Sequence, residues 1–310
     1  MPGHTGSWFN QPNVLARCPV RACSQSWGLE LNPYSSETWK VIRGLLLELT
    51  TLFPDSPLHL GGDEVTHMCW AEDPALAALP ASKQMKWIYF EQELKKCVEE
   101  LPNNPTIIRW QESAPLKANN TKNDVWFQIW MNPGPNSIEK WAVSSTPLIS
   151  SLGWYLDNQC MTWKQCYEAN PLAPIVKAKE NARAPLEMLG FEACAWELPE
   201  DAYGTENIWA RLVAISDRMW AGEFGVKTNA ETEAGLIRTC RILAKEWNLF
   251  PEFLCTTDSL DKRASTPGNI LEFPKRRKKR DTQICARMNR YSETSYPCTT
   301  HACLARSWTD

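Results

Sequence analysis

Hydrophobic positions along this 310-residue chain follow two spacings that alternate. Apolar residues three and four positions apart predict helices, because such positions share one face of an α-helix. The expected helices span 37–53, 83–100, 208–221 and 230–247. Short apolar runs bounded by Pro, Gly or polar residues predict buried strands. The expected strands are 58–60, 106–110, 125–130, 148–152 and a less periodic run at 186–196.

Strands and helices that alternate in this way are typical of an α/β protein with a parallel sheet and helical crossovers. The pattern leaves open whether the sheet is open and doubly wound or closed as a barrel. A closed (β/α)8 barrel needs eight strands, whereas this pattern supplies five. The first 34 residues are interrupted by Pro, Gly and Asn and predict loop.

Helix boundaries and buried faces can also be expected from the pattern. Ser36 and Asn229 are of the residue types that cap helix N-termini, at the starts of the first and last expected helices. The buried stripe expected for the first helix is Ile42, Leu45, Leu46, Leu49 and Leu52. The buried stripe expected for the last helix is Leu236, Cys240, Leu243 and Trp247.

Composition narrows the class of protein. A net charge of -3 argues against a general nucleic-acid binder, and no apolar run approaches the roughly 18 residues of a membrane-spanning helix. Twelve Cys in a chain of this length fit a folded domain in an oxidising compartment. Sixteen Trp are unusual, and an indole ring suits both core packing and stacking on sugar rings.

The two ends of the chain differ from its middle. Met1 is followed by Pro-Gly-His without a charged or apolar region, so we expect either an intracellular protein or a missing natural beginning. Asn119 lies in an N-glycosylation pattern, which mildly favours the second option. Residues 257–310 predict a flexible polar tail, and the six basic residues Lys275 to Arg280 fit either a solvated tail or a polyanion-binding patch.

Candidate chemistry stands directly after the first expected strand, at Gly61-Gly62-Asp63-Glu64. Two neighbouring carboxylates can serve one pocket only where a strand turns into a loop, and the glycines give that freedom. Crowding two acids raises the pKa of one of them, so that one can act as general acid while the other stays charged. The alternative is a turn that leads into a helix with acids at its N-terminus.

The residues around this pair resemble the His-x-Gly-Gly-Asp-Glu signature of glycoside hydrolase family 20, the β-N-acetylhexosaminidases, at positions 59–64. Further pieces of the family pattern stand in the same order along the chain. They are Pro2-Gly3-His4-Thr5, Cys69-Trp70, Trp110-Gln111-Glu112, Gln128-Ile129-Trp130, Trp154-Tyr155-Leu156-Asp157, Glu192-Ala193-Cys194-Ala195-Trp196, Arg211 and Arg218-Met219-Trp220. The resemblance implies a (β/α)8 TIM-type barrel over 1–256 that lacks its first two to three strands, with the active site at the carboxyl ends of the strands.

The resemblance also implies an activity: hydrolysis of terminal β-linked GlcNAc or GalNAc in glycans, glycolipids or chitin oligosaccharides, by substrate-assisted retaining catalysis without cofactor or metal. Glu64 is then the general acid and base, and Asp63 orients the substrate's acetamide group. The residues that the resemblance places around the sugar are His4, Trp110, Trp130, Tyr155, Asp157, Trp196 and Glu197. In the family one residue normally separates the Trp and Glu that adjoin here.

Disulfides between Cys18 and Cys69 and between Cys240 and Cys255 follow from the same resemblance, as do a lysosomal or secreted location and a possible homodimer. We expect no nucleic-acid partner and no membrane span. The competing hypothesis is a non-catalytic remnant of the barrel that acts as a binding protein or is a partial gene product. A third hypothesis is that the protein binds DNA in the nucleus through Lys275 to Arg280. This hypothesis predicts strongly salt-dependent binding to DNA.

Overall fold

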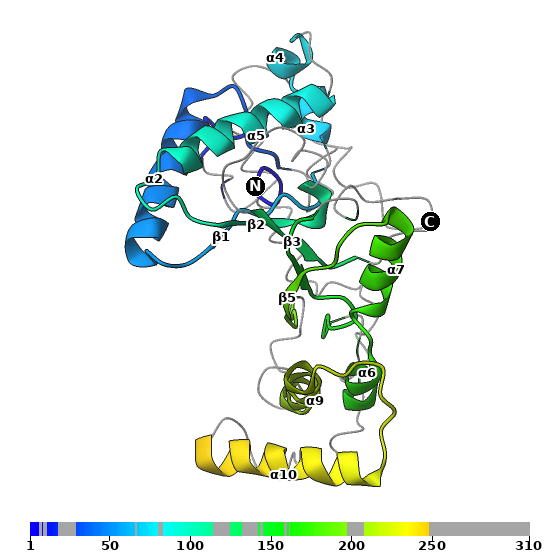
Figure 1. Cartoon of the computed structure of the whole chain (residues 1–310). Coiled ribbons are helices and arrows are strands. Elements are labelled where there is room, and N and C mark those ends of the chain that lie inside the picture. Colours follow the sequence, from blue (N-terminus) through cyan, green and yellow to red (C-terminus); the bar gives the residue numbers. More distant parts are fainter. Residues whose placement is uncertain are drawn as a thin grey trace, which may run out of the picture. The chain divides into compact units, whose positions relative to one another are not determined.

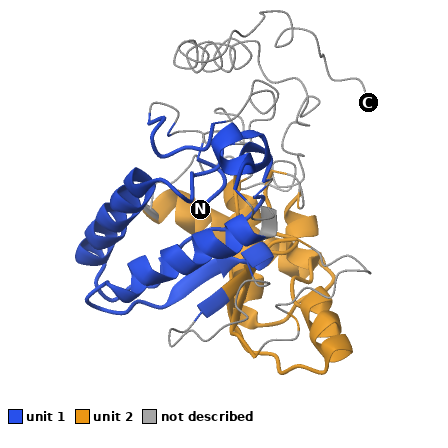
Figure 2. Ribbon diagram, turned by 90° about the horizontal axis from the view of Figure 1, so that it is seen from above, with its two compact units in different colours: residues 1–126, 271–310 blue, residues 127–270 orange. Residues whose placement is uncertain are grey.

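The computed structural model describes residues 1–5, 8, 11–17, 29–65, 67–79, 83–113, 125–131, 142, 145–157, 160, 162–196 and 208–247. Its elements in chain order are α2 (Ser36–Leu52), β1 (Leu58–His59), α3 (Met68–Glu72), α4 (Pro74–Ala77), α5 (Lys83–Glu99), β2 (Ile107–Trp110), β3 (Val125–Ile129), β4 (Leu148–Ser150), α6 (Trp163–Glu168), α7 (Ala173–Ala182), β5 (Met188–Phe191), α9 (Ile208–Ala221) and α10 (Ala230–Trp247) (Figure 1). They divide into two compact units (Figure 2). The described residues up to Trp126 belong to the first, and those from Phe127 onwards to the second.

The first unit is built on the parallel pair β1 and β2, in which Leu58 lies opposite Ile107. Helices α2 and α5 pack against each other (Figure 1). Their buried faces form one core with the strands and with α3. Members of this core from α2 and α5 are Trp39, Ile42, Leu46, Phe90, Leu94, Cys97 and Val98. The helical connection between two parallel strands confirms the crossover expected from the pattern.

Helix α2 differs in detail from its prediction. The N-cap is Ser35 and not Ser36, and its hydroxyl donates to the Asn13 carbonyl at 2.6 Å. The buried face runs through Trp39, Ile42, Leu46 and Thr50, while Leu45 and Leu52 are 37% and 63% exposed. Leucines lie on nearly every side of this helix, so hydrophobicity alone could not single out the face that packs.

The second unit carries the parallel strands β3, β4 and β5, with Phe127 opposite Leu148 and Ile149 opposite Gly190. Helices α6 and α7 lie in the connection from β4 to β5. Helix α9 packs against both α6 and α10. Asn229 caps α10 as expected, because its side-chain oxygen accepts from the Thr232 N–H at 2.8 Å.

Local signals explain why α6 and α7 form in a stretch with no clear apolar period. Thr162 and Gln165 make a reciprocal capping box at the start of α6. Pro174 stands in the first turn of α7, where a missing N–H leaves no hydrogen bond unmade. Both signals are readable in the sequence, although the apolar spacing alone predicts no helix in this stretch.

The α/β class with parallel strands is therefore confirmed in both units, whereas the division into a 1–256 barrel and a 257–310 tail stays a prediction. The tail lies outside the described residues, as does Lys275 to Arg280. Within the described part of the chain, no helix combines the length and the apolar character required to cross a bilayer.

One disulfide lies within the described part of the second unit. Cys160 and Cys166 form a disulfide between the loop after β4 and helix α6, a pairing that the sequence did not reveal. Cys69 in the first unit and Cys240 in the second are also disulfide-bonded. Their expected partners, Cys18 and Cys255, lie outside the described residues, so those two pairings stay predictions.

Core packing on α2 can be tested with adjacent leucines. Leu46 is 1% exposed and Leu47 is 52% exposed. We expect Leu46→Ala to lower the free energy of unfolding by about 2–5 kcal/mol, because it leaves a cavity. The matched Leu47→Ala is expected to change it by about 0.5 kcal/mol or less. Urea unfolding followed by circular dichroism measures both, and equal losses would contradict the assignment of the buried face.

Candidate active site

The chain turns sharply at the end of β1. Leu60 and Gly61 continue the pairing with β2, because the Leu60 N–H donates to Ile108 at 2.9 Å and the Gly61 carbonyl accepts from Trp110 at 3.1 Å. Gly61, Gly62 and Glu64 then have φ values of 70°, 101° and 46°. Positive φ is unusual for a glutamate and such strain concentrates at functional sites.

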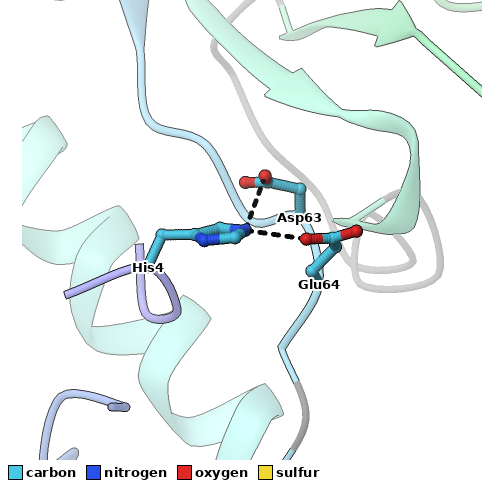
Figure 3. Close-up of side chains that lie close together, drawn as sticks. All are labelled: His4, Asp63 and Glu64. Atoms are coloured by element: carbon cyan, nitrogen blue, oxygen red, sulfur yellow. Dashed lines mark ion pairs between the residues drawn. The ribbon is translucent and has the colours of Figure 1, made fainter. Parts of the chain in front are cut away.

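These dihedrals change the direction of the side chains. On a regular strand, Asp63 and Glu64 would point to opposite faces. Here both carboxylates extend toward the same imidazole, that of His4 (Figure 3). The structure therefore favours the loop interpretation of Gly-Gly-Asp-Glu over the alternative of a turn into a helix, since α3 begins only at Met68.

His4 reaches the pair from a separate loop whose backbone packs on the first. A Cβ on Gly3 would lie 3.3 Å from the Asp63 carbonyl oxygen, so glycine permits the close approach. The Nε2 atom of His4 lies 3.1 Å from Asp63 Oδ2 and 3.1 Å from Glu64 Oε2 (Figure 3). One imidazole thus bridges two carboxylates.

Charges within this cluster stabilise one another. The hydrogen bond to Asp63 raises the pKa of His4 against the effect of burial, and the negative charges of Asp63 and Glu64 add to the rise. Burial alone would raise the pKa of Asp63. The hydrogen bond from His4 and the charge of its imidazolium outweigh burial and lower that pKa. Asp63 is therefore an anion at neutral pH.

The same three side chains are a possible donor set for a cation. Their ligand atoms lie within 4.8 Å of one another. Imidazole nitrogen and carboxylate oxygen are ligands that zinc accepts. The raised pKa of His4 favours a proton at that nitrogen, so a cation would have to displace it.

Trp110 ends β2 beside the turn. Its ring is half-buried and lies 5.0 Å, centroid to centroid, from that of His59. His59 also accepts a hydrogen bond at Nδ1 from the Gly61 N–H at 3.1 Å. Sequence reasoning assigned a role to Trp110 but none to His59.

A second group of expected residues lies together in the second unit. The rings of Trp130 and Tyr155 are 5.8 Å apart. Asp157 Oδ1 accepts a hydrogen bond from the backbone N–H of Trp196 at 3.5 Å. Trp196 is 61% exposed. Burial raises the pKa of Tyr155 above its ordinary value, so its hydroxyl stays protonated and can donate a hydrogen bond.

Polar residues that the sequence analysis left without a role support Tyr155. The side-chain amide of Gln128 donates to Ser151 Oγ at 2.7 Å and to the Glu192 carboxylate. Cys194 is hydrogen-bonded to Tyr155, and burial raises the pKa of the Cys194 thiol to about 11. A polar Gln128 within the apolar run of β3 was the signal that could have revealed this network.

Arg211 anchors the loop that carries Tyr155 and Asp157. This arginine on α9 is fully buried, and its Nη1 donates to the carbonyls of Leu156 at 2.5 Å and Cys160 at 3.1 Å. The Cys160–Cys166 disulfide fixes the same loop covalently.

The structure thus brings together His4, Asp63 and Glu64 in one unit and Trp130, Tyr155, Asp157 and Trp196 in the other. Glu197 and Asn119 lie outside the described residues. The chemical roles expected for all these residues remain predictions.

Comparisons with known proteins identify the family of this chain. Residues 1–223 match the sequence model of the glycosyl hydrolase family 20 catalytic domain, so the chain belongs to that family. The human β-hexosaminidase subunit beta is 28% identical over 231 residues, which cover 72% of this chain and 41% of the relative. The rat β-hexosaminidase subunit alpha is 30% identical over 239 residues, covering 71% and 43%. The chain therefore spans less than half the length of either relative.

Solved structures support the fold. A glycoside hydrolase family 20 β-N-acetylglucosaminidase matches with a TM-score of 0.56 and 18% identity, over 81% of this chain and 57% of that one. The crystal structure of a β-N-acetylhexosaminidase matches with a TM-score of 0.56 and 21% identity, over 80% and 56%.

The bridge made by His4 predicts a pH window of stability. A raised pKa makes the His4 contribution complete below its ordinary value of 6.5 and lost as pH rises through the folded pKa. A lowered pKa makes the Asp63 contribution complete above 3.8 and lost as pH falls through the folded pKa. We expect His4→Gln to destabilise most between these values.

Urea unfolding at about pH 5.5 and about pH 9 measures this window. Because both side chains are partly exposed, the extra loss at the lower pH should be about 1 kcal/mol or less. The extra loss at the lower pH should shrink when Asp63→Asn is already present, because only the Glu64 carboxylate then faces His4. A loss that is equal at both pH values would show that the bridge carries no net charge interaction.

The turn itself can be tested with two glycines. A Cβ on Gly62 would lie 2.0 Å from Ser113 Oγ and 2.6 Å from Arg109 Nη2, at a φ of 101°. We expect Gly62→Ala to cost about 2 kcal/mol or more of unfolding free energy through strain and overlap. Gly44 on α2 has nothing within 4 Å, so Gly44→Ala should stabilise by about 0.5–1 kcal/mol. Thermal unfolding compares them, and a neutral Gly62→Ala would refute the close approach.

Proposed function

We propose that this chain carries the chemistry of an exo-β-N-acetylhexosaminidase, which releases terminal β-linked GlcNAc or GalNAc from glycans, glycolipids or chitin oligosaccharides. The observation that carries the proposal is the pair of adjacent carboxylates bridged by His4, in a chain that belongs to glycosyl hydrolase family 20. No cofactor is required for this reaction.

The arrangement of the carboxylates supports substrate-assisted retention. Ordinary glycosidases place two carboxyl groups on either side of the scissile bond. Asp63 and Glu64 are instead consecutive residues whose carboxylates face one imidazole. This arrangement suits two different roles on one side of the sugar. The nucleophile is then the oxygen of the substrate's own 2-acetamido group.

Each step has a residue that fits it. Glu64 donates its proton to the glycosidic oxygen as the acetamide oxygen bonds to the anomeric carbon, and the aglycone leaves as an alcohol. Asp63, which is ionised at neutral pH, accepts the acetamide N–H and stabilises the positive charge of the oxazolinium intermediate. Glu64 then removes a proton from a water molecule as the water oxygen bonds to the anomeric carbon. The bond between that carbon and the acetamide oxygen breaks, which opens the oxazolinium ring and regenerates the acetamide.

The remaining residues are assigned to the sugar. Tyr155 donates a hydrogen bond to the acetamide oxygen, and Asp157 and Glu197 bind outer hydroxyls. Trp110, Trp130 and Trp196 supply apolar faces for the ring and the acetamide methyl. Trp196 is 61% exposed, so its ring is accessible to a ligand.

We further propose that the strands belong to a (β/α)8 barrel whose first two to three strands lie outside this sequence, and that the protein is lysosomal or secreted. Family membership and the parallel strand pairs support the barrel. The disulfide between Cys160 and Cys166 supports an oxidising compartment. A homodimer remains part of the proposal.

Hydrolysis of a chromogenic β-GlcNAc substrate tests the function. We expect Glu64→Gln to lower kcat by about 10²–10⁴-fold, because it removes general acid–base catalysis. The exposed control Glu48→Gln on α2 should leave kcat unchanged. The matching β-glucoside lacks the acetamido group and should not be cleaved, since it has no internal nucleophile.

The outcomes separate the hypotheses. Cleavage of the β-glucoside at a similar rate would replace substrate assistance by a two-carboxylate mechanism. A folded wild-type chain that binds GlcNAc without hydrolysing its glycosides would instead be the sugar-binding remnant.

A further inference from the structure

Behind the Gly61-Gly62 turn lies a buried polar chain that the proposed chemistry does not use. It begins at Glu91 on α5, passes through Arg109 on β2 and ends at Ser113, just after that strand. Arg109 and Ser113 are 5% and 4% exposed. These three hydrogen-bonded side chains therefore lie between α5 and β2, away from solvent.

The guanidinium of Arg109 donates to both of its neighbours in this row of side chains. Arg109 Nη2 donates to Glu91 Oε1 at 2.5 Å and to Ser113 Oγ at 3.1 Å. Since the Ser113 oxygen accepts from the guanidinium, its own O–H is left to donate to the Gly62 carbonyl, 3.3 Å away. Trp87 also donates to Glu91 Oε1, at 3.4 Å.

Steric contact reinforces these bonds. A Cβ on Gly62 would overlap both Ser113 and Arg109, so the backbone of the turn already rests on these two side chains. Gly62 directly precedes Asp63, and the carboxylates are aimed by the dihedrals of this segment. A displacement of Ser113 would therefore be transmitted to the carboxylates through the Gly62 peptide.

Stability alone does not account for an ion pair in this place. Replacing a buried pair by packed apolar residues is often neutral or stabilising. Elsewhere α5 packs its buried face with Phe90, Leu94 and Val98. Unlike apolar residues, these polar side chains supply a directed hydrogen bond to the Gly62 carbonyl.

We propose that Ser113, held by the Glu91–Arg109 pair, is a positioning residue that fixes the Gly62 carbonyl and thereby aims Asp63 and Glu64 at His4. The kinetic consequence of this role rests on the proposed function, while its structural consequence does not. Removing Arg109 itself would strand the Glu91 charge, so Ser113 is the place to test it.

The test compares two substitutions of nearly equal size, Ser113→Thr and Ser113→Val, which differ in the hydroxyl. We expect Ser113→Val to lower kcat by about 10-fold or more, with a smaller change in KM, because slight misplacement of catalytic groups lowers the rate of the chemical step. Thr should stay within about threefold of the wild type, because it keeps the donor to Gly62. Ser113→Ala, which adds no bulk, should repeat the loss if the Val variant does not fold.

A second measurement does not depend on catalysis. The chain has four histidines, so the His4 imidazole can be assigned and titrated by NMR. The groups that perturb His4 are Asp63, Glu64 and the amino group of Met1, none of which these substitutions change. We expect the pKa of His4 to move back toward 6.5 in the Val and Ala variants and to stay raised in Thr.

Each result decides a separate point. Equal kinetics and equal His4 titrations for Thr and Val would overturn the positioning role. A wild-type chain without activity would overturn the proposed function, and the NMR titration would still decide whether Ser113 positions the pair.

Discussion

Neighbouring residues of a strand point to opposite faces, and the site depends on breaking this rule within a few residues. Left-handed dihedrals at Gly61, Gly62 and Glu64 do so immediately after β1. Because a left-handed φ is unfavourable for Glu64, the rest of the first unit must stabilise the loop in this conformation. The support comes from the pairing with β2, the Pro2-Gly3-His4 loop and the buried chain that ends at Ser113.

Electrostatics at this loop is a consequence of the same geometry. Two carboxylates forced to one side repel each other, and the imidazole of His4 lies where it offsets that repulsion. The histidine also has a left-handed φ, so two of the three residues that define the site, His4 and Glu64, are strained. The site is thus held by charge complementarity as well as by backbone packing.

Much of the fold, and the position of the loop that carries the carboxylates, could be predicted from the sequence. The bounds of long periodic segments such as α9 and α10 were predicted closely. The motif from His59 to Glu64 predicted a loop that carries two carboxylates, and the chemical roles of these carboxylates stay predictions. The exposure of Leu45 and Leu52 could not be predicted, since only the packing partner decides which side of a leucine-rich helix is buried. Arg109 and Ser113 were missed because their role depends on Gly62, which is distant in sequence and adjacent only in the fold. Gln128 and Glu192 stood within recognised motifs, but their contact with each other is equally non-local.

The close approach of Gly62 to two side chains has a consequence for how this site can vary. A residue with a Cβ at position 62 would need smaller groups at positions 109 and 113, yet those groups supply the hydrogen bond that holds the turn. Divergence at any one of the three is therefore conditional on the other two. Among related chains they should vary as a set, with Glu91 following Arg109 because its charge has that guanidinium as its partner.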